Sequence, residues 1–377
     1  MSKSIFTEIN RFLIAISLIA TPVNPYIFGM TLYIWIVLIF FDFEFLAKLK
    51  FVKLKYILIC LSWITLALIE FKITIAVKLS ILFLGILYLC TQDKVIFPKI
   101  KLAFIISCFF CIAQFFLYYI DPSISASIAG INIGTFIWGE NFATPAYVNQ
   151  YVVFLFPRMA GLSREAGFFV SLLGIMVLLI LSKRKKINLY ESVLYISSYF
   201  FSLSKVSMSV VFLFFLLPFK NILNKIPLFL SILTVVSLFI LLALKLDISH
   251  NGYFYINESI AHRLSSSSMV LNMKEGNFLL GCNENYNCTI NNEEPLYNYL
   301  NSRNLTPNTG INGIWVDFGL LGIILLAITL FSLKVKTFDF LVLVLITSTV
   351  TLFTLDNFVI LTYYYILINC RNSIFNK

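Results

Sequence analysis

Charged residues are scarce in this chain of 377 residues: aspartate, glutamate, lysine and arginine make up only 12% of it, whereas 60% of its residues are hydrophobic. A soluble globular protein carries roughly 25% charged residues. The scarcity excludes an ordinary soluble domain and predicts an all-α, polytopic integral membrane protein, with a single transmembrane domain over residues 1–377. The net charge of +10 does not indicate nucleic-acid binding, because the basic residues fall in short clusters between apolar runs.

Several motifs that carry chemistry are absent from the sequence. It has two histidines, no glycine-rich phosphate loop, no metal-ligand pair spaced for one helix face and no Ser-His-Asp constellation. The seven cysteines show no zinc spacing, and Cys108 and Cys111 lie in an apolar run where their separation is that of one helix face. ATP-driven transport and metal-dependent hydrolysis therefore lack support, and we expect no cofactor and no metal.

The apolar runs suffice for about twelve transmembrane helices, since one crossing takes roughly 20 apolar residues. Most lysines and arginines fall between alternate runs, most densely at 183–186, and cytoplasmic loops are enriched in these residues. This pattern predicts cytoplasmic termini and two outer polar stretches, 120–166 and the large loop 247–311. The clearest predicted helices are 56–70, 73–91, 167–182, 313–333, 338–354 and 357–370.

The segment from Phe156 to Phe169, Phe-Pro-Arg-Met-Ala-Gly-Leu-Ser-Arg-Glu-Ala-Gly-Phe-Phe, places three charges and two glycines before an uncharged run. Ionisable groups at a membrane boundary are costly and tend to persist where they bind or react. Arg158, Arg164 and Glu165 are therefore the first candidate site residues. The alternative is that the arginines anchor a helix end at headgroup depth.

Other polar groups fall on the same predicted side. Lys205 lies in a hydroxyl-rich turn between two spans, where it either joins the site or caps the helix hairpin. Lys72 and Lys78 resemble interfacial lysines that extend to the headgroups. Cys282 and Cys288 lie close together in the large outer loop, and an oxidising compartment permits either a disulfide or two free thiols.

Four local patterns follow one another along the chain. They are Arg158-Met-Ala-Gly-Leu-Ser-Arg-Glu-Ala-Gly167, Ser202-Leu-Ser-Lys205, Arg263 with Asn277-Phe-Leu-Leu-Gly281, and Asn308-Thr-Gly-Ile-Asn-Gly-Ile-Trp-Val-Asp-Phe-Gly-Leu-Leu-Gly322. In order and sidedness they resemble segments of the polytopic polymerases and ligases of bacterial surface polysaccharides, specifically the O-antigen polymerases. Two departures are Asn308, where ligases carry His, and Asp317, where the family carries Glu.

The resemblance implies a GT-C-like fold, with a periplasmic loop bearing the Arg/Glu motif at 120–166 and a large periplasmic loop at 247–311. It also implies a metal-independent glycosyltransferase of the bacterial inner membrane that joins undecaprenyl-diphosphate-linked oligosaccharide repeat units in lipopolysaccharide O-antigen biosynthesis. Membrane lipid and a polysaccharide chain-length regulator are the other implied partners, and nucleic acid is not. Arg158 and Arg263 are then expected on the diphosphate, with Arg164 and Lys205 assisting, because guanidinium forks bind such groups bidentately.

Two roles stay open for Glu165: the base that takes the acceptor's proton, or an ion-pair partner that holds Arg164 or Arg158. His262 and Asn308 are candidates on the acceptor side, although a loop histidine is often only solvated. One alternative function is an O-antigen ligase, which the missing His at 308 disfavours. Another is a flippase for lipid-linked sugar, which should carry charges on broken helices at the membrane centre in two repeated halves.

Overall fold

The computed structural model describes residues 2–27, 30–145, 152–153, 156–184, 186–204, 206–248, 253–282, 286, 288–289, 295–302 and 305–370. Across these ranges nearly every element is a helix. The exceptions are two short antiparallel pairs, β1 (Tyr26–Ile27) with β2 (Met30–Thr31) and β3 (Val152–Val153) with β4 (Phe156–Pro157). The prediction of a helical protein is confirmed.

Five helices in the described part of the chain are long and apolar enough to cross a membrane. Four further apolar helices are shorter, and the count of twelve spans and the GT-C-like arrangement stay predictions. The five long helices are α5 (Ile73–Thr91), α6 (Asp93–Ile120), α9 (Ala166–Arg184), α13 (Leu228–Leu246) and α18 (Asn312–Ser332). The shorter ones are α4 (Leu54–Ile69), α11 (Ser207–Leu216) with the turns that continue it, α19 (Thr337–Ile346) and α20 (Asn357–Asn369).

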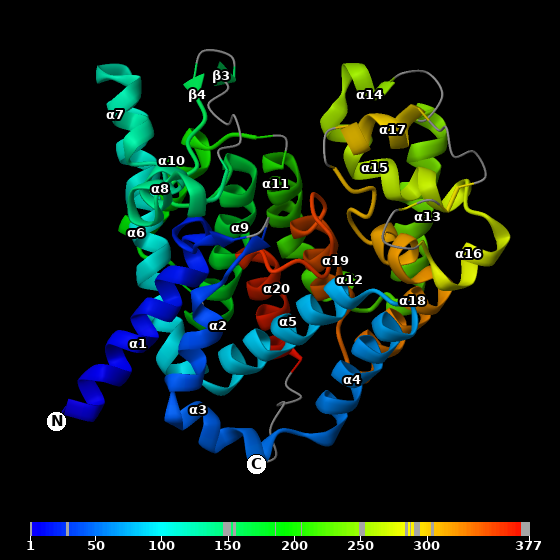
Figure 1. Cartoon of the computed structure of the whole chain (residues 1–377), viewed down its shortest axis with the longest axis horizontal. Helices are drawn as coiled ribbons and strands as arrows, with labels where there is room; N and C mark the ends of the chain where they lie inside the picture. Colours follow the sequence, from blue (N-terminus) through cyan, green and yellow to red (C-terminus); the bar gives the residue numbers. More distant parts are fainter. Residues whose placement is uncertain are drawn as a thin grey trace.

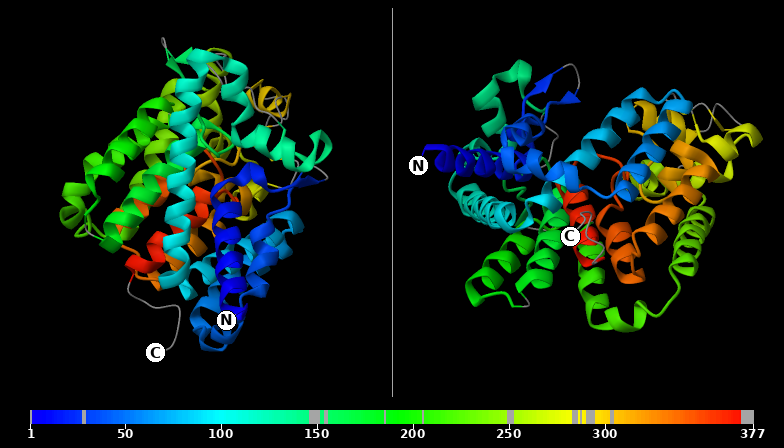
Figure 2. Two further views of the ribbon diagram at one scale, coloured as in Figure 1. Left: turned by 90° about the vertical axis from the view of Figure 1, so that its left-hand side faces the viewer. Right: turned by 90° about the horizontal axis from the view of Figure 1, so that it is seen from below.

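Helix α20 lies at the centre of the bundle (Figure 1; Figure 2), where it packs against α5, α9 and α19. Phe358, Tyr364 and Tyr365 on this helix are almost fully buried. On the side of α4, Trp63 makes edge-on contacts with the rings of Phe318 and Phe353. These aromatic contacts fix α18 and the chain before α20 against the α4–α5 hairpin, and they position the walls of the site described below.

The two ends of the molecule differ in their elements. At the lower end in Figure 1 lie the start of α1 (Ser2–Ile19) and α3 (Phe43–Lys48). There the guanidinium of Arg11 is buried against Asp42, with a nitrogen–oxygen distance of 2.8 Å. The upper end carries α7 (Pro122–Ser127), α14 (Tyr253–Ile256), α15 (Glu258–Leu271) and α17 (Pro295–Ser302). The two stretches predicted as outer loops therefore contain helices, and these four helices lie at one end.

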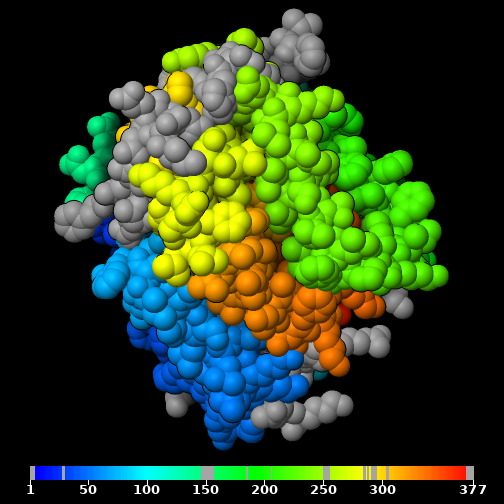
Figure 3. Space-filling model, turned by 90° about the vertical axis from the view of Figure 1, so that its right-hand side faces the viewer, coloured from blue at the N-terminus to red at the C-terminus, as the bar shows by residue number. Residues whose placement is uncertain are grey.

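The segment that follows α13 folds back over α18. Figure 3 shows residues of α15 and α16 (Glu275–Leu280), in yellow, lying on α18, in orange, between α13 and the α4–α5 hairpin. Helix α19 ends at Ile346, eight residues earlier than the sequence predicts. The threonine-rich chain that follows contacts the segment before α18, where the Gly310 amide donates a hydrogen bond to the Val350 carbonyl at 2.9 Å. The threonine-rich chain supplies hydroxyl groups to the site.

Candidate functional site

Two cavities with charged and polar side chains in their walls adjoin the first turns of α5 and share part of their walls. The larger, here called the Glu165 cavity, has a volume of about 460 Å³. The smaller, here called the Asp317 cavity, has a volume of about 290 Å³. Lys78, Thr306 and Thr351 line both. The two cavities are therefore adjacent compartments of one site.

The Glu165 cavity gathers predicted residues from distant parts of the sequence. Arg164 and Glu165 come from the turn before α9, and His262 and Arg263 come from α15. Asp356, directly before α20, completes the charged wall. The tertiary structure thus brings four candidate site residues, Arg164, Glu165, His262 and Arg263, to the wall of one cavity.

Glu165 is a carboxylate held among cations. Burial raises its pKa above the ordinary value, and the positive charges of Arg164, Arg158 and Arg263 oppose this rise, while Asp356 adds to it. Burial also lowers the pKa of the Arg263 guanidinium, against the opposing charge of Glu165. The two groups therefore interact electrostatically, and Glu165 keeps a higher basicity than an exposed carboxylate.

His262 lines the same cavity, and one of its two ring nitrogens already has a hydrogen-bond partner. Its Nε2 lies 3.1 Å from the carbonyl oxygen of Thr306. Burial lowers its pKa, the Thr306 contact raises it, and the charge of the adjacent Arg263 lowers it. A neutral imidazole bonded to a carbonyl through Nε2 donates its proton there, so Nδ1 is the nitrogen left to accept.

Arg158 lines neither of these two cavities. It directly follows strand β4, and the amide of the neighbouring Met159 donates a hydrogen bond to the Phe201 carbonyl at 2.8 Å. Its charge nevertheless acts on Glu165, where it favours the ionised carboxylate. Lys205, the other residue predicted to assist at the diphosphate, lies outside the described residues.

Helix α6 fixes the turn that carries Arg164 and Glu165. The Gln114 side chain donates from Nε2 to the Gly161 carbonyl at 2.9 Å, and its Oε1 accepts from the Gly161 amide at 3.0 Å. Ser107 Oγ accepts from the Leu162 amide at 3.0 Å. Gly161 has φ +56°, and a Cβ there would lie 2.6 Å from the Ser107 carbonyl oxygen. Only glycine fits this turn without strain.

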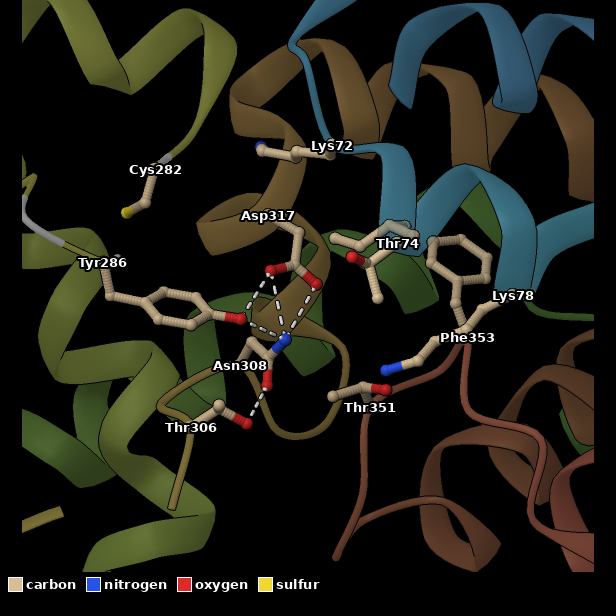
Figure 4. Close-up of a pocket in the computed structure, with 11 residues that line it drawn as sticks. Lys72, Thr74, Lys78, Cys282, Tyr286, Thr306, Asn308, Asp317, Thr351 and Phe353 are labelled. Carbon is tan, nitrogen blue, oxygen red and sulfur yellow. Dashed lines mark hydrogen bonds between the residues drawn. The ribbon is translucent and has the colours of Figure 1, made fainter. Parts of the chain in front are cut away.

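The Asp317 cavity contains a hydrogen-bonded cluster (Figure 4). The Asn308 amide donates to both carboxylate oxygens of Asp317 at 3.1 Å and lies 2.7 Å from the Tyr286 hydroxyl, which itself donates to Asp317 at 3.3 Å. Thr306 donates to the Asn308 Oδ1 at 2.8 Å. Asn308, predicted on the acceptor side, thus orients a carboxylate whose residue is only 5% exposed.

The carboxylate lies at a break in α18. Gly319 has φ +61° and ψ −161°, so the helix is interrupted two residues after Asp317. The end of α16 fills the break: the Cys282 amide donates to the Val316 carbonyl at 2.7 Å, and a Cβ on Gly319 would lie 2.2 Å from the Leu279 carbonyl. Non-helical backbone at membrane depth needs such internal partners.

A disulfide between Cys282 and Cys288 closes the short loop that carries Tyr286. Of the two alternatives open from the sequence, the structure has the bond. Tyr286 has a positive φ of +52°, and its hydroxyl reaches the Asp317 cluster. The disulfide therefore links Cys282, which lines the cavity, to the chain just after Tyr286, which lines it too.

Two lysines of the site were interpreted from the sequence as interfacial anchors. Lys72 is instead 2% exposed, with its amino group 2.6 Å from Glu70 and 5.1 Å from the centre of the Phe318 ring. Lys78 reaches into both cavities. Their position in the sequence could have identified both as site residues. Both lie within two turns of the start of α5, on the side of the membrane where Arg164 is also predicted.

No family model, no curated protein and no solved structure matches this chain.

Proposed function

We propose that this chain is an O-antigen polymerase, a glycosyltransferase that joins undecaprenyl-diphosphate-linked oligosaccharide repeats at the periplasmic face of a bacterial inner membrane. The observation that carries the proposal is the convergence of Arg164, Arg263 and Lys78 around Glu165 in one cavity at the outer end of membrane helices. Both termini are then cytoplasmic, and a chain-length regulator is the expected protein partner.

In the proposed reaction a hydroxyl oxygen of the incoming unit attacks the anomeric carbon of the growing glycan. The bond from that carbon to the diphosphate oxygen breaks, and the diphosphate leaves with the electron pair. Arg164 and Arg263 stabilise its charge through preorganised, always-protonated donors. The acceptor proton passes to Glu165, whose pKa burial raises toward the range in which a carboxylate is an effective base. Arg158 acts through its charge on Glu165.

A transporter is the alternative of another class, and the break in α18 is the feature that favours it. Transporters bind substrates at broken helices near the membrane centre. Here the break lies eight residues into α18, and backbone of α16 fills it from the outer side. The charged groups gather at one end of the bundle, which favours chemistry at a surface over passage through the membrane.

The proposal is tested by the surface-glycan ladder of cells that lack this gene, complemented with wild type or Glu165→Gln at matched protein level. We expect a single repeat on the core in the deletion strain, a full ladder with wild type, and no ladder with Glu165→Gln. A deletion strain without any repeat on the core, in which lipid-linked polymer accumulates outside, identifies a ligase instead. Lipid-linked units that stay on the cytoplasmic face identify a transporter.

A further inference from the structure

The Asp317 cavity has a composition different from that of the Glu165 cavity. Its walls offer a carboxylate, an amide and the hydroxyls of Thr74, Tyr286 and Thr351, together with the ring of Phe353. The Asp317 carboxylate is buried, and its oxygens accept hydrogen bonds from Asn308 and Tyr286, which fix its orientation. Such a wall can both accept and donate hydrogen bonds from fixed positions.

These groups match a polyhydroxylated ligand. Vicinal hydroxyls need acceptors and donors side by side. The Asp317 carboxylate has further lone pairs and is the acceptor. The hydroxyls of Thr74 and Thr351 and the amino group of Lys78 line the same cavity and are donors. An aromatic face beside them covers the apolar C–H surface of a sugar ring, and Tyr286 and Phe353 line the same cavity. The volume of about 290 Å³ lies near the lower limit of small-molecule sites, roughly 300–1,000 Å³.

The Asp317 cavity also adjoins the Glu165 cavity, where the donor diphosphate is proposed to bind, so a ligand in it would lie beside the donor. Lys78 lines both cavities, and Figure 4 shows its amino group directed into the Asp317 cavity beside Thr351. A ligand hydroxyl held near Lys78 and Thr351 is therefore close to the wall that the two cavities share. The Asp317 cavity is therefore an adjoining compartment with its own recognition groups.

We propose that the Asp317 cavity binds a terminal sugar of the accepting lipid-linked unit. Asp317, oriented by Asn308, accepts hydrogen bonds from its hydroxyls, and Lys78 lies at the boundary with the donor diphosphate. The proposal rests on the proposed function for the identity of the accepting unit. It assigns Asp317 and Lys78 to substrate binding and Asn308 to positioning the Asp317 carboxylate, and it predicts that the two cavities recognise different parts of the substrates.

The test uses the purified full-length protein in detergent and two probes, measured by calorimetry. One probe is the free repeat oligosaccharide, released by mild acid from the host's lipid-linked pool, and the other is undecaprenyl diphosphate without sugar. The variants are Asn308→Ala, which removes the amide, and Thr74→Tyr, which fills the exposed side of the cavity without disturbing the buried cluster. Thr234→Tyr on the exposed face of α13 is the matched control, since Thr234 lines neither cavity.

Asn308→Ala leaves the Asp317 carboxylate without its orienting partner, and Thr74→Tyr fills the space for the sugar. We expect each to weaken oligosaccharide binding by about tenfold or more and to leave undecaprenyl diphosphate binding unchanged. Thr234→Tyr should match wild type with both probes. The inference is overturned if wild type does not bind the oligosaccharide, or if Thr74→Tyr binds it as tightly as wild type does. Retained binding of undecaprenyl diphosphate and an intact glycan ladder would then leave the proposed polymerase function standing.

Discussion

Replacing Arg263 should change both the rate of the proposed reaction and its pH dependence. Arg263→Ala removes a guanidinium from the Glu165 cavity, and losing one donor at a developing anion costs about 10²- to 10³-fold in rate. Because Arg164 and Lys78 line the same cavity and remain, we expect the lower end of this range, about 100-fold.

The pH dependence follows from the charge that Arg263 places near Glu165. The positive charge of Arg263 lowers the pKa of Glu165, so removing it raises that pKa further. A general base must be ionised to act, and the rate rises with pH through its pKa. The acid limb of the rate profile should therefore shift to higher pH in Arg263→Ala, and it should stay near its wild-type position in Arg263→Lys, which keeps the charge but loses the planar fork.

The assay follows chain growth from lipid-linked repeats with purified protein over about pH 5 to 9, so that both limbs of a rate profile centred near neutral pH are recorded. Lys245→Ala is the matched control, since Lys245 is an exposed cation at the outer end of α13 that lines neither cavity. A rate for Arg263→Ala equal to that of wild type refutes the role at the diphosphate. A large loss of rate with an unmoved acid limb refutes the coupling between Arg263 and Glu165.

Three further predictions concern the walls of the site. Gly161→Ala should lower the melting temperature and the activity, because φ +56° costs an alanine about 1 kcal/mol or more and its Cβ would meet the Ser107 carbonyl; Gly276→Ala, where nothing lies within 4 Å, should leave both near wild type. Gln114→Leu removes the side chain on α6 that bonds to both the backbone N–H and the carbonyl of Gly161. This should lower the free energy of unfolding by about 1–3 kcal/mol and reduce polymer formation. A melting temperature equal to that of wild type would show that Gln114 does not hold this turn. The double variant Cys282→Ser with Cys288→Ser should lose about 2 kcal/mol of stability from the opened loop and weaken oligosaccharide binding through Tyr286, and unchanged oligosaccharide affinity would show that the disulfide does not position that wall.

Much of the local structure was predictable, because hydrophobic runs and breaks act over short distances. The predicted helix at 73–91 is α5, and the predicted helices at 167–182 and 357–370 correspond to α9 and α20 within two residues at each end. The helix predicted at 338–354 ends early at Ile346, since the hydroxyl-rich chain after it bonds to Gly310 and turns toward the cavity. Composition alone cannot show that contact.

The sequence by itself determined that this is a helical membrane protein whose unusual charges lie at one end, because the cost of burying charge in hydrocarbon acts on each segment separately. It also pointed to Arg164, Glu165 and Arg263 as members of one site. Only the tertiary structure decided how such residues meet: packing of α5, α15 and the turn before α9 brings Lys78 into the site and leaves Arg158 outside both cavities. The break in α18 that holds Asp317 depends on α16 lying against it, a contact between segments almost forty residues apart that no local pattern encodes.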